Sequence, residues 1–286
     1  MEFEKNLFCL YSDEKCDDGG IEALRLYLPT KDGYVNHNIT HSVMKSTNCD
    51  TWRLSTVYFC NDAFERVRPL TRSGAEWEMA LKIKGRPDFI GGYAHGDEVF
   101  KSVKLTIDGE ERILTDISVL TAFERLEYEV WSVGYDPNDS ITEAILHDKR
   151  IIVDENGVRV EQRVEWLNDY ELGNSYMAMM PPFKSETDFY FTDNDPTKKE
   201  IPEKVSIAET CNTKGLYLRG NAGFTFGLCP EKYLSDSDGA NTYLITDNGG
   251  VPYNKMYFLL HHGGKACKGD VWETVTIYAV EKSEKS

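Results

Sequence analysis

The chain has 286 residues and carries 48 Asp and Glu against 32 Lys and Arg, so its formal net charge is −16. Hydrophobic residues make up 41% of the sequence and aromatic residues 12%, a composition that excludes a disordered chain. The acidic excess argues against binding to nucleic-acid backbones or anionic membranes, whereas a local basic cleft in an acidic surface would still accept an anionic sugar. No apolar stretch approaches the length of a membrane-spanning helix.

The N-terminal sequence and the cysteines indicate the compartment. Met1–Lys5 has no basic segment followed by an apolar core, so we expect a cytoplasmic protein or, if a signal peptide has been removed, a secreted one. The seven cysteines are odd in number and show no Cys-x-x-Cys spacing, which predicts reduced, mostly buried thiols.

A period of two dominates the first half of the chain. Residues 76–83 place Trp77, Met79, Leu81 and Ile83 on one face and Glu78 on the other, which predicts a half-buried strand. Residues 99–107 alternate in the same way, and Asp108-Gly109 then supplies a hairpin turn.

The second half continues this pattern. After the turn at Asn156-Gly157, residues 158–166 direct their valines and Trp166 to one face and Arg159, Glu161, Arg163 and Glu165 to the other. Residues 271–280 form a closing strand rich in β-branched and aromatic side chains. We therefore predict an all-β fold, an antiparallel β-sandwich of supersandwich or jelly-roll type with little helix, in a single domain over residues 1–286.

The densest group of acid and base side chains lies in residues 88–98, D-F-I-G-G-Y-A-H-G-D-E. Glycines let the backbone approach a ligand, and histidine is suited to proton transfer near neutral pH. Tyr93, His95, Asp97 and Glu98 therefore form a candidate acid/base cluster, in which 93, 95 and 97 would share one face of a strand. The alternative is an irregular turn that satisfies its own backbone.

Other residues are candidates for ligand binding. His37 and His41 have the spacing of metal ligands on a helix, but their Asn-rich, β-branched surroundings favour a polar strand that faces a sugar, so we expect no metal. Arginines and lysines that would neutralise a carboxylate are Arg53, Arg86, Lys101 and Arg163. Trp131 and Tyr135 would stack on sugar rings. His147 is expected at the surface or in a loop, and at most one of His261 and His262 would enter a cleft.

The order of these features resembles a known family. Residues 127–136, 156–166, 176–181, 254–258 and 268–278 resemble strands of the galactose-mutarotase-like supersandwich proteins, most closely the polysaccharide lyase branch. The resemblance covers roughly residues 120–280. It implies a concave sheet that holds a glycan, and a β-elimination that needs a group to neutralise the uronate, a base and an acid.

These observations lead to three competing functions. The first is a lyase of an acidic poly- or oligosaccharide, without a cofactor, since no nucleotide-binding or serine-hydrolase motif is present. The second is a non-catalytic glycan-binding or phage-tail-like module. The third is a sugar mutarotase, or a glycoside hydrolase that pairs Asp97 with Glu165. The oligomeric state stays open.

The candidate residues take their roles from the first of these functions. The expected catalytic residues are His95, Tyr93, Arg163 and Glu98. The expected substrate-binding residues are Arg53, His41, Lys101, Glu165, Trp131 and Tyr135.

Overall fold

The computed structural model describes residues 6–16, 19–72, 77–201, 208–213, 215–232, 241–245 and 250–282. Within this part of the chain, no helix is long and apolar enough to cross a membrane.

Strands make up almost all of the regular structure. In chain order they are β1 (Leu7–Ser12), β2 (Gly20–Thr30), β3 (Gly33–Met44), β4 (Cys49–Leu54), β5 (Tyr58–Cys60), β6 (Arg66–Pro69), β7 (Glu98–Ile107), β8 (Glu110–Arg112), β9 (Thr121–Phe123), β10 (Leu126–Tyr135), β11 (Glu143–Asp154), β12 (Gly157–Trp166), β13 (Tyr170–Met180), β14 (Phe189–Thr192), β15 (Lys199–Glu200), β16 (Ala208–Asn212), β17 (Leu216–Arg219), β18 (Phe224–Lys232), β19 (Asn241–Ile245), β20 (Lys255–Ala266) and β21 (Val271–Lys282). The helical segments are α1 (Gly92–His95) and the single 3₁₀ turns η1 (Lys45–Thr47), η2 (Leu114–Asp116) and η3 (Lys184–Glu186).

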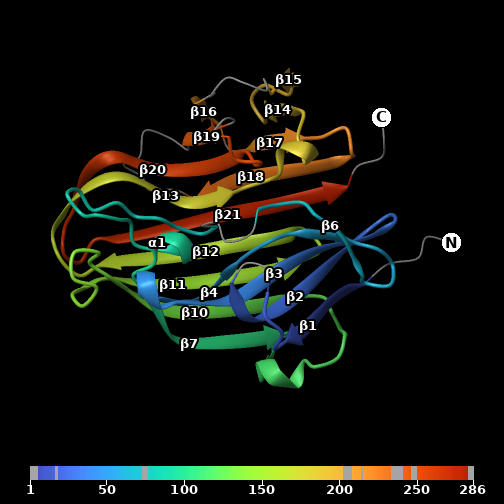
Figure 1. The fold of residues 1–286 in the computed structure, drawn as a ribbon, viewed down its shortest axis with the longest axis horizontal. Coiled ribbons are helices and arrows are strands. Elements are labelled where there is room, and N and C mark those ends of the chain that lie inside the picture. Colours follow the sequence, from blue (N-terminus) through green and yellow to red (C-terminus); the bar gives the residue numbers. More distant parts are fainter. Residues whose placement is uncertain are drawn as a thin grey trace.

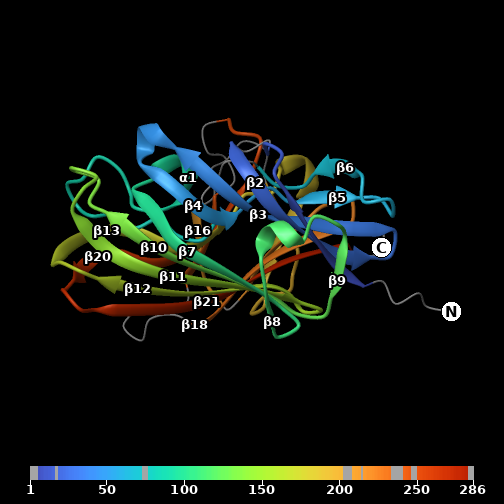
Figure 2. The same ribbon diagram turned by 90° about the horizontal axis from the view of Figure 1, so that it is seen from below.

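Most of the strands pair in one ladder that folds over on itself. Its order is β9-β1-β2-β3-β4-β7-β10-β11-β12-β21-β18-β17-β14-β15. Every pair is antiparallel except β4 with β7, where two residues pair in parallel. At this junction the N-terminal strands turn over the face of the larger sheet, so that the two layers of a sandwich form (Figures 1 and 2). A smaller sheet, β13-β20-β19-β16, lies along one side.

The sandwich explains why an alternating sequence folds in this way. Side chains from both layers meet in one core, in which Leu24 and Ile39 of the N-terminal layer pack with Tyr128 and Val160 of the larger sheet. Strands such as β12 bury every second residue in this core, whereas β3 is covered on both faces and buries eight consecutive residues, Gly33–Thr40. The predicted all-β sandwich with little helix is confirmed.

Three of the four predicted strands are present with nearly the expected bounds. Residues 99–107 lie in β7, residues 158–166 in β12 and residues 271–280 in β21. In β12 the valines and Trp166 are buried, and the arginines and glutamates between them are half-buried, as the alternation predicts. Asp108 and Gly109 form the turn between β7 and β8.

The prediction for residues 76–83 is wrong in two respects. Residue 76 lies outside the described residues, and from Trp77 onward the segment forms single bridges, Ala80 to Tyr176 and Ile83 to Leu172, rather than a strand. Trp77, Met79, Leu81 and Ile83 are buried as expected. Glu78, however, is buried too, because Lys149 and the Leu54 amide surround its carboxylate inside the sandwich.

Candidate functional site

The segment 88–98 is built as a short helical turn between glycines. Gly91 and Gly96 have positive φ, and α1 lies between them. A Cβ atom at Gly96 would lie 1.9 Å from the Thr47 carbonyl oxygen, so only glycine permits this close approach. The expected strand is therefore wrong here: residues 93, 95 and 97 do not share a strand face, and Asp97 has a φ of 50°.

His95 forms a pair with a carboxylate at the protein surface. Its Nδ1 lies 2.5 Å from Asp88 Oδ1, and its side chain is 25% exposed. The Phe89 ring lies 4.6 Å from the imidazole, centroid to centroid. Asp88 also accepts a hydrogen bond from the Phe89 amide, which fixes the carboxylate beside the ring. A carboxylate on one imidazole nitrogen selects the tautomer whose basic lone pair is on the other nitrogen.

Tyr93 lies on the neighbouring part of α1 and covers an arginine. The Arg53 guanidinium carbon is 5.0 Å from the centre of the Tyr93 ring. Arg53 is buried on β4, where Nε donates to Ser42 Oγ at 2.9 Å and Nη1 to the Leu54 carbonyl at 3.1 Å. The two residues thus form a cation–π contact beneath the surface.

Glu98 does not join this group, because its side chain turns into the sandwich. It accepts hydrogen bonds from Ser132 Oγ at 2.7 Å and from His147 Nδ1 at 2.8 Å. Burial alone would raise the pKa of Glu98, but His147, Lys149 and Ser132 outweigh it and hold the pKa at about 2. The side chain is therefore a fixed anion within the core, not a proton donor.

His147 is buried as well, which corrects its expected place at the surface. Its Nε2 lies 3.2 Å from Gln162 Oε1, and Gln162 Nε2 donates to the Met177 carbonyl at 2.7 Å. This donation orients the Gln162 amide so that its oxygen faces His147. The two ring nitrogens of His147 thus lie between the Glu98 carboxylate and the Gln162 amide oxygen, inside the sandwich.

Three predicted residues lie on the opposite side of the molecule. Arg163, Glu165 and Trp131 project from the outer face of the larger sheet, where Arg163 Nη2 lies 2.8 Å from Glu165 and Nη1 lies 3.7 Å from Asp148. Trp131 and Arg163 line a shallow groove of about 360 Å³ on β10, β11, β12 and β21. Opposite charges alternate across this groove.

The remaining predicted binding residues contact partners elsewhere. Lys101 Nζ lies 3.1 Å from the Tyr135 hydroxyl. His41 stacks on Trp52, with its two nitrogens 2.7 Å from Glu22 and 2.7 Å from Asp50. The side chains of His261 and His262 lie outside the described residues. The structure thus brings Tyr93 into contact with Arg53, pairs His95 with Asp88 on the same turn, and disperses the other predicted site residues.

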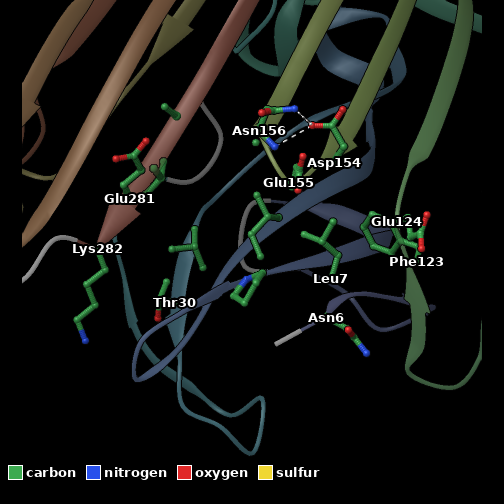
Figure 3. Close-up of a pocket in the computed structure, with 16 residues that line it drawn as sticks. Asn6, Leu7, Thr30, Phe123, Glu124, Asp154, Glu155, Asn156, Glu281 and Lys282 are labelled. Carbon is green, nitrogen blue, oxygen red and sulfur yellow. Dashed lines mark hydrogen bonds between the residues drawn. The ribbon is translucent and has the colours of Figure 1, made fainter. Parts of the chain in front are cut away.

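A cavity at one open end of the sandwich contains none of the predicted site residues. It measures about 870 Å³ (Figure 3). Its apolar lining includes Leu7 and Phe123, and its acidic lining includes Glu124, Asp154 and Glu281. These carboxylates would repel an acidic glycan.

Sequence reasoning missed two participants. Asp88 opens the glycine-rich segment but was not chosen as a site residue, although it precedes His95 by seven residues in the same loop. Gln162 lies within the alternating segment 158–166, and nothing in that pattern marks its contact with His147 on β11. Only the folded loop and the strand register reveal these two contacts.

Comparison with known proteins finds likeness in solved structures alone. No family model matches the chain, and no curated protein matches it. The α-N-acetylgalactosaminidase of Bifidobacterium bifidum, solved with GalNAc, is 11% identical over 90% of this chain and 36% of its own length, with a TM-score of 0.48. A GH36 α-galactosidase from Geobacillus stearothermophilus is 11% identical over 90% of this chain and 40% of its own, with a TM-score of 0.48.

A smaller protein is similar over its whole length. A galactose mutarotase-like protein from Lactobacillus casei is 7% identical over 90% of this chain and 100% of its own, with a TM-score of 0.44. The chain spans well under half the length of the two glycosidases.

Proposed function

We propose that this chain is a carbohydrate-active protein that moves a proton to or from a sugar at His95. The observation that carries the proposal is the hydrogen bond between His95 Nδ1 and Asp88 Oδ1, on a partly exposed turn held between two glycines. The carboxylate orients the imidazole, which suits a general base or acid.

The surroundings of the pair suit a sugar ring. Aromatic rings extend from His95 through Phe89 to Tyr176, at 4.6 and 6.3 Å between centroids, and then to Tyr257 at 4.8 Å. Phe89 and Tyr257 are only partly buried. Sugar C–H faces pack on such rings, while the hydroxyl groups remain available for hydrogen bonds.

Among sugar reactions, mutarotation of a neutral aldose requires least beyond this pair. A base takes the proton of the C1 hydroxyl while the bond from C1 to the ring oxygen breaks, and an acid protonates that oxygen. His95 supplies the base, and the Tyr93 phenol on the same turn is the candidate acid. A carboxylate-neutralising cation is not needed.

β-Elimination from a uronate is the second candidate, and one observation favours it. Arg53 lies under Tyr93, the candidate acid. Tyr93 belongs to α1, the same helical turn that carries the candidate base His95. Against it, Arg53 already donates to Ser42 and Leu54, and Arg163 belongs to the opposite face of the larger sheet. A non-catalytic glycan-binding module would use the same aromatic rings without turnover.

The test measures both reactions on the same preparations. Anomer interconversion is followed by polarimetry on a panel of freshly dissolved aldoses, and ultraviolet absorbance of an unsaturated product is followed on a panel of uronate polysaccharides. His95→Ala should lower the rate of whichever reaction occurs by about two to four orders of magnitude. Asp88→Asn should lower it less, because the imidazole stays but loses its orienting carboxylate.

A matched control removes a carboxylate elsewhere. Asp195 is exposed in the connection between β14 and β15, where it accepts a hydrogen bond from the Thr197 amide. Asp195→Asn should leave the rate unchanged. If His95→Ala retains the wild-type rate at an unchanged melting temperature, the proposal is wrong. Sugar binding without either reaction would assign the chain to the binding modules.

A further inference from the structure

We propose that a pocket between β3 and the segment that follows β4 binds a single hydroxyl group of a polyol ligand. This inference deepens the proposed function, because it names the feature of the sugar that the protein would recognise. It rests on four polar side chains that are buried beside a small cavity: Asn38, Thr40, Ser55 and Thr56.

Each of these side chains has an oxygen atom without a hydrogen-bond partner. The atoms are Asn38 Oδ1, Thr40 Oγ1, Ser55 Oγ and Thr56 Oγ1, and all four residues are less than 5% exposed. A buried polar atom without a partner costs roughly 1–3 kcal/mol, so four of them around one cavity call for an explanation. A bound oxygen-containing group supplies one.

The cavity fits one such group. Its volume is about 10 Å³, close to the roughly 10–15 Å³ that one buried water needs. Tyr58, Cys16 and the exposed Arg66 complete its lining. The pocket therefore has room for one oxygen atom. The exposed Arg66 side chain forms part of the wall between the pocket and the solvent.

The donors and acceptors select a hydroxyl group. Asn38 Nδ2 donates to the Thr56 carbonyl at 2.6 Å, so Asn38 Oδ1 is the end of the amide that faces a ligand and can only accept. The three hydroxyls donate or accept. A carboxylate cannot donate to Asn38, and an ammonium group would meet the Arg66 guanidinium in the lining. A hydroxyl group donates and accepts, so it satisfies the whole set.

The pocket is connected to the proposed catalytic turn through one arginine. Thr40 lies directly opposite Arg53 in the register of β3 and β4, and Arg53 lies under Tyr93. Gly19 allows the Tyr93 hydroxyl to approach, since a Cβ atom at Gly19 would lie 2.3 Å from it. A hydroxyl bound in the pocket would thus belong to a ligand next to α1.

The test compares two buried threonines that both lack a partner. Thr40 lines the pocket, whereas Thr276 lies on β21, and its Oγ1 is equally buried and unpartnered. Thr40→Val and Thr276→Val should each leave the melting temperature unchanged or higher, because each replaces an unsatisfied hydroxyl with a methyl group. Only Thr40→Val should weaken polyol binding, by about tenfold for one lost hydrogen bond.

Binding is measured on the ¹⁵N-labelled chain with glycerol, xylose and glucose as probes. The expected result is a set of shifts at the amides of residues 38, 40, 55 and 56 that saturates in the wild type and in Thr276→Val, and that needs about tenfold more probe in Thr40→Val. Equal affinities in both variants, or no shifts at these residues with any probe, would overturn the inference. So would a lower melting temperature in Thr40→Val alone, because it would assign the pocket to a structural water.

His95→Ala separates this inference from the proposed function. In that variant the shifts at residues 38–56 should persist, because His95 does not line the pocket. Persistent shifts together with wild-type turnover would refute the catalytic role of His95 and leave the pocket in place. Lost shifts in His95→Ala would refute the separate pocket.

Discussion

At the scale of single residues, Glu98 shows how an ionised side chain can be part of a core. Its pKa of about 2 is depressed from an ordinary value of 4.5, so its contribution to stability is present above about pH 5 and is lost as the pH falls toward 2. Glu98→Gln removes the buried anion that His147 and Ser132 contact in the core. We expect a loss of about 3–5 kcal/mol in the free energy of unfolding at pH 7.

Denaturant unfolding of wild type and Glu98→Gln over a series of pH values tests this. The difference between the two should shrink as the pH falls from about 5 to about 2, because the wild-type carboxylate then gains a proton. Glu273→Gln is the control, since Glu273 pairs with Lys232 at the surface and should change stability by less than about 1 kcal/mol. A pH-independent difference between wild type and Glu98→Gln would contradict the prediction.

The cysteines differ in reactivity because some are buried and Cys267 is exposed. Burial raises the pKa of Cys9 and of Cys49 to about 12 and that of Cys60 to about 11, whereas Cys267 is exposed. The thiolate is the reactive form, so a thiol reagent at pH 8 should modify Cys267 and leave these three unmodified until the chain unfolds. Peptide mapping by mass spectrometry measures the order in which the cysteines are modified. Early labelling of Cys9 or Cys49 would disagree with the fold.

At the scale of elements, β12 separates packing from surface charge. Val160 is fully buried between the layers. Arg163 lies on the opposite face of the same strand and forms ion pairs at the surface. Val160→Ala should lower the free energy of unfolding by roughly 2 kcal/mol, because it leaves a cavity in the core. Arg163→Ala should change it by less than about 1 kcal/mol. Chemical denaturation of the two variants measures the difference, and equal effects would mean that the faces of β12 are misassigned.

The same two elements show what a sequence pattern can predict. Alternation assigned β12 correctly because its charged side chains face outward, while the inward-facing Gln162 finds partners in His147 and the Met177 carbonyl. The pattern at Trp77–Ile83 is equally regular, yet Glu78 points inward, because the Lys149 ammonium 71 residues away compensates it. A partner so distant leaves no local signal.

Turn chemistry limited the prediction of the candidate site in a similar way. The glycines around Tyr93 and His95 correctly marked an unusual backbone, but their positive φ angles produce a helical turn and not a strand. This turn sends His95 toward Asp88, while Glu98 begins β7 and enters the core. Neighbours in sequence therefore serve different parts of the molecule, and the pairing of His95 with Asp88 becomes visible only after folding.

At the scale of the whole molecule, the last strand completes the larger sheet. β21 pairs with β12 on one side and with β18 on the other, so residues from the middle and the end of the chain meet on it. It also supplies Tyr278, whose hydroxyl donates to the Trp77 carbonyl, and Lys282, which pairs with Asp32 at 2.6 Å across the open end of the sandwich. These contacts join the N-terminal layer, the larger sheet and the segment that leads to α1.

We therefore expect folding of the chain to require the whole of β21. A chain that ends at residue 270 lacks β21 and exposes two strand edges, β12 and β18, together with the apolar core face that β21 covers. We expect it to aggregate or to lack the near-ultraviolet circular dichroism of packed tryptophans. A chain that ends at residue 282 keeps every described contact of β21 and should match the full chain in spectrum and melting temperature. If the chain that ends at residue 270 is soluble and unfolds cooperatively, the strands before β21 form a sufficient core. In that case β21 is not required to hold the two layers together.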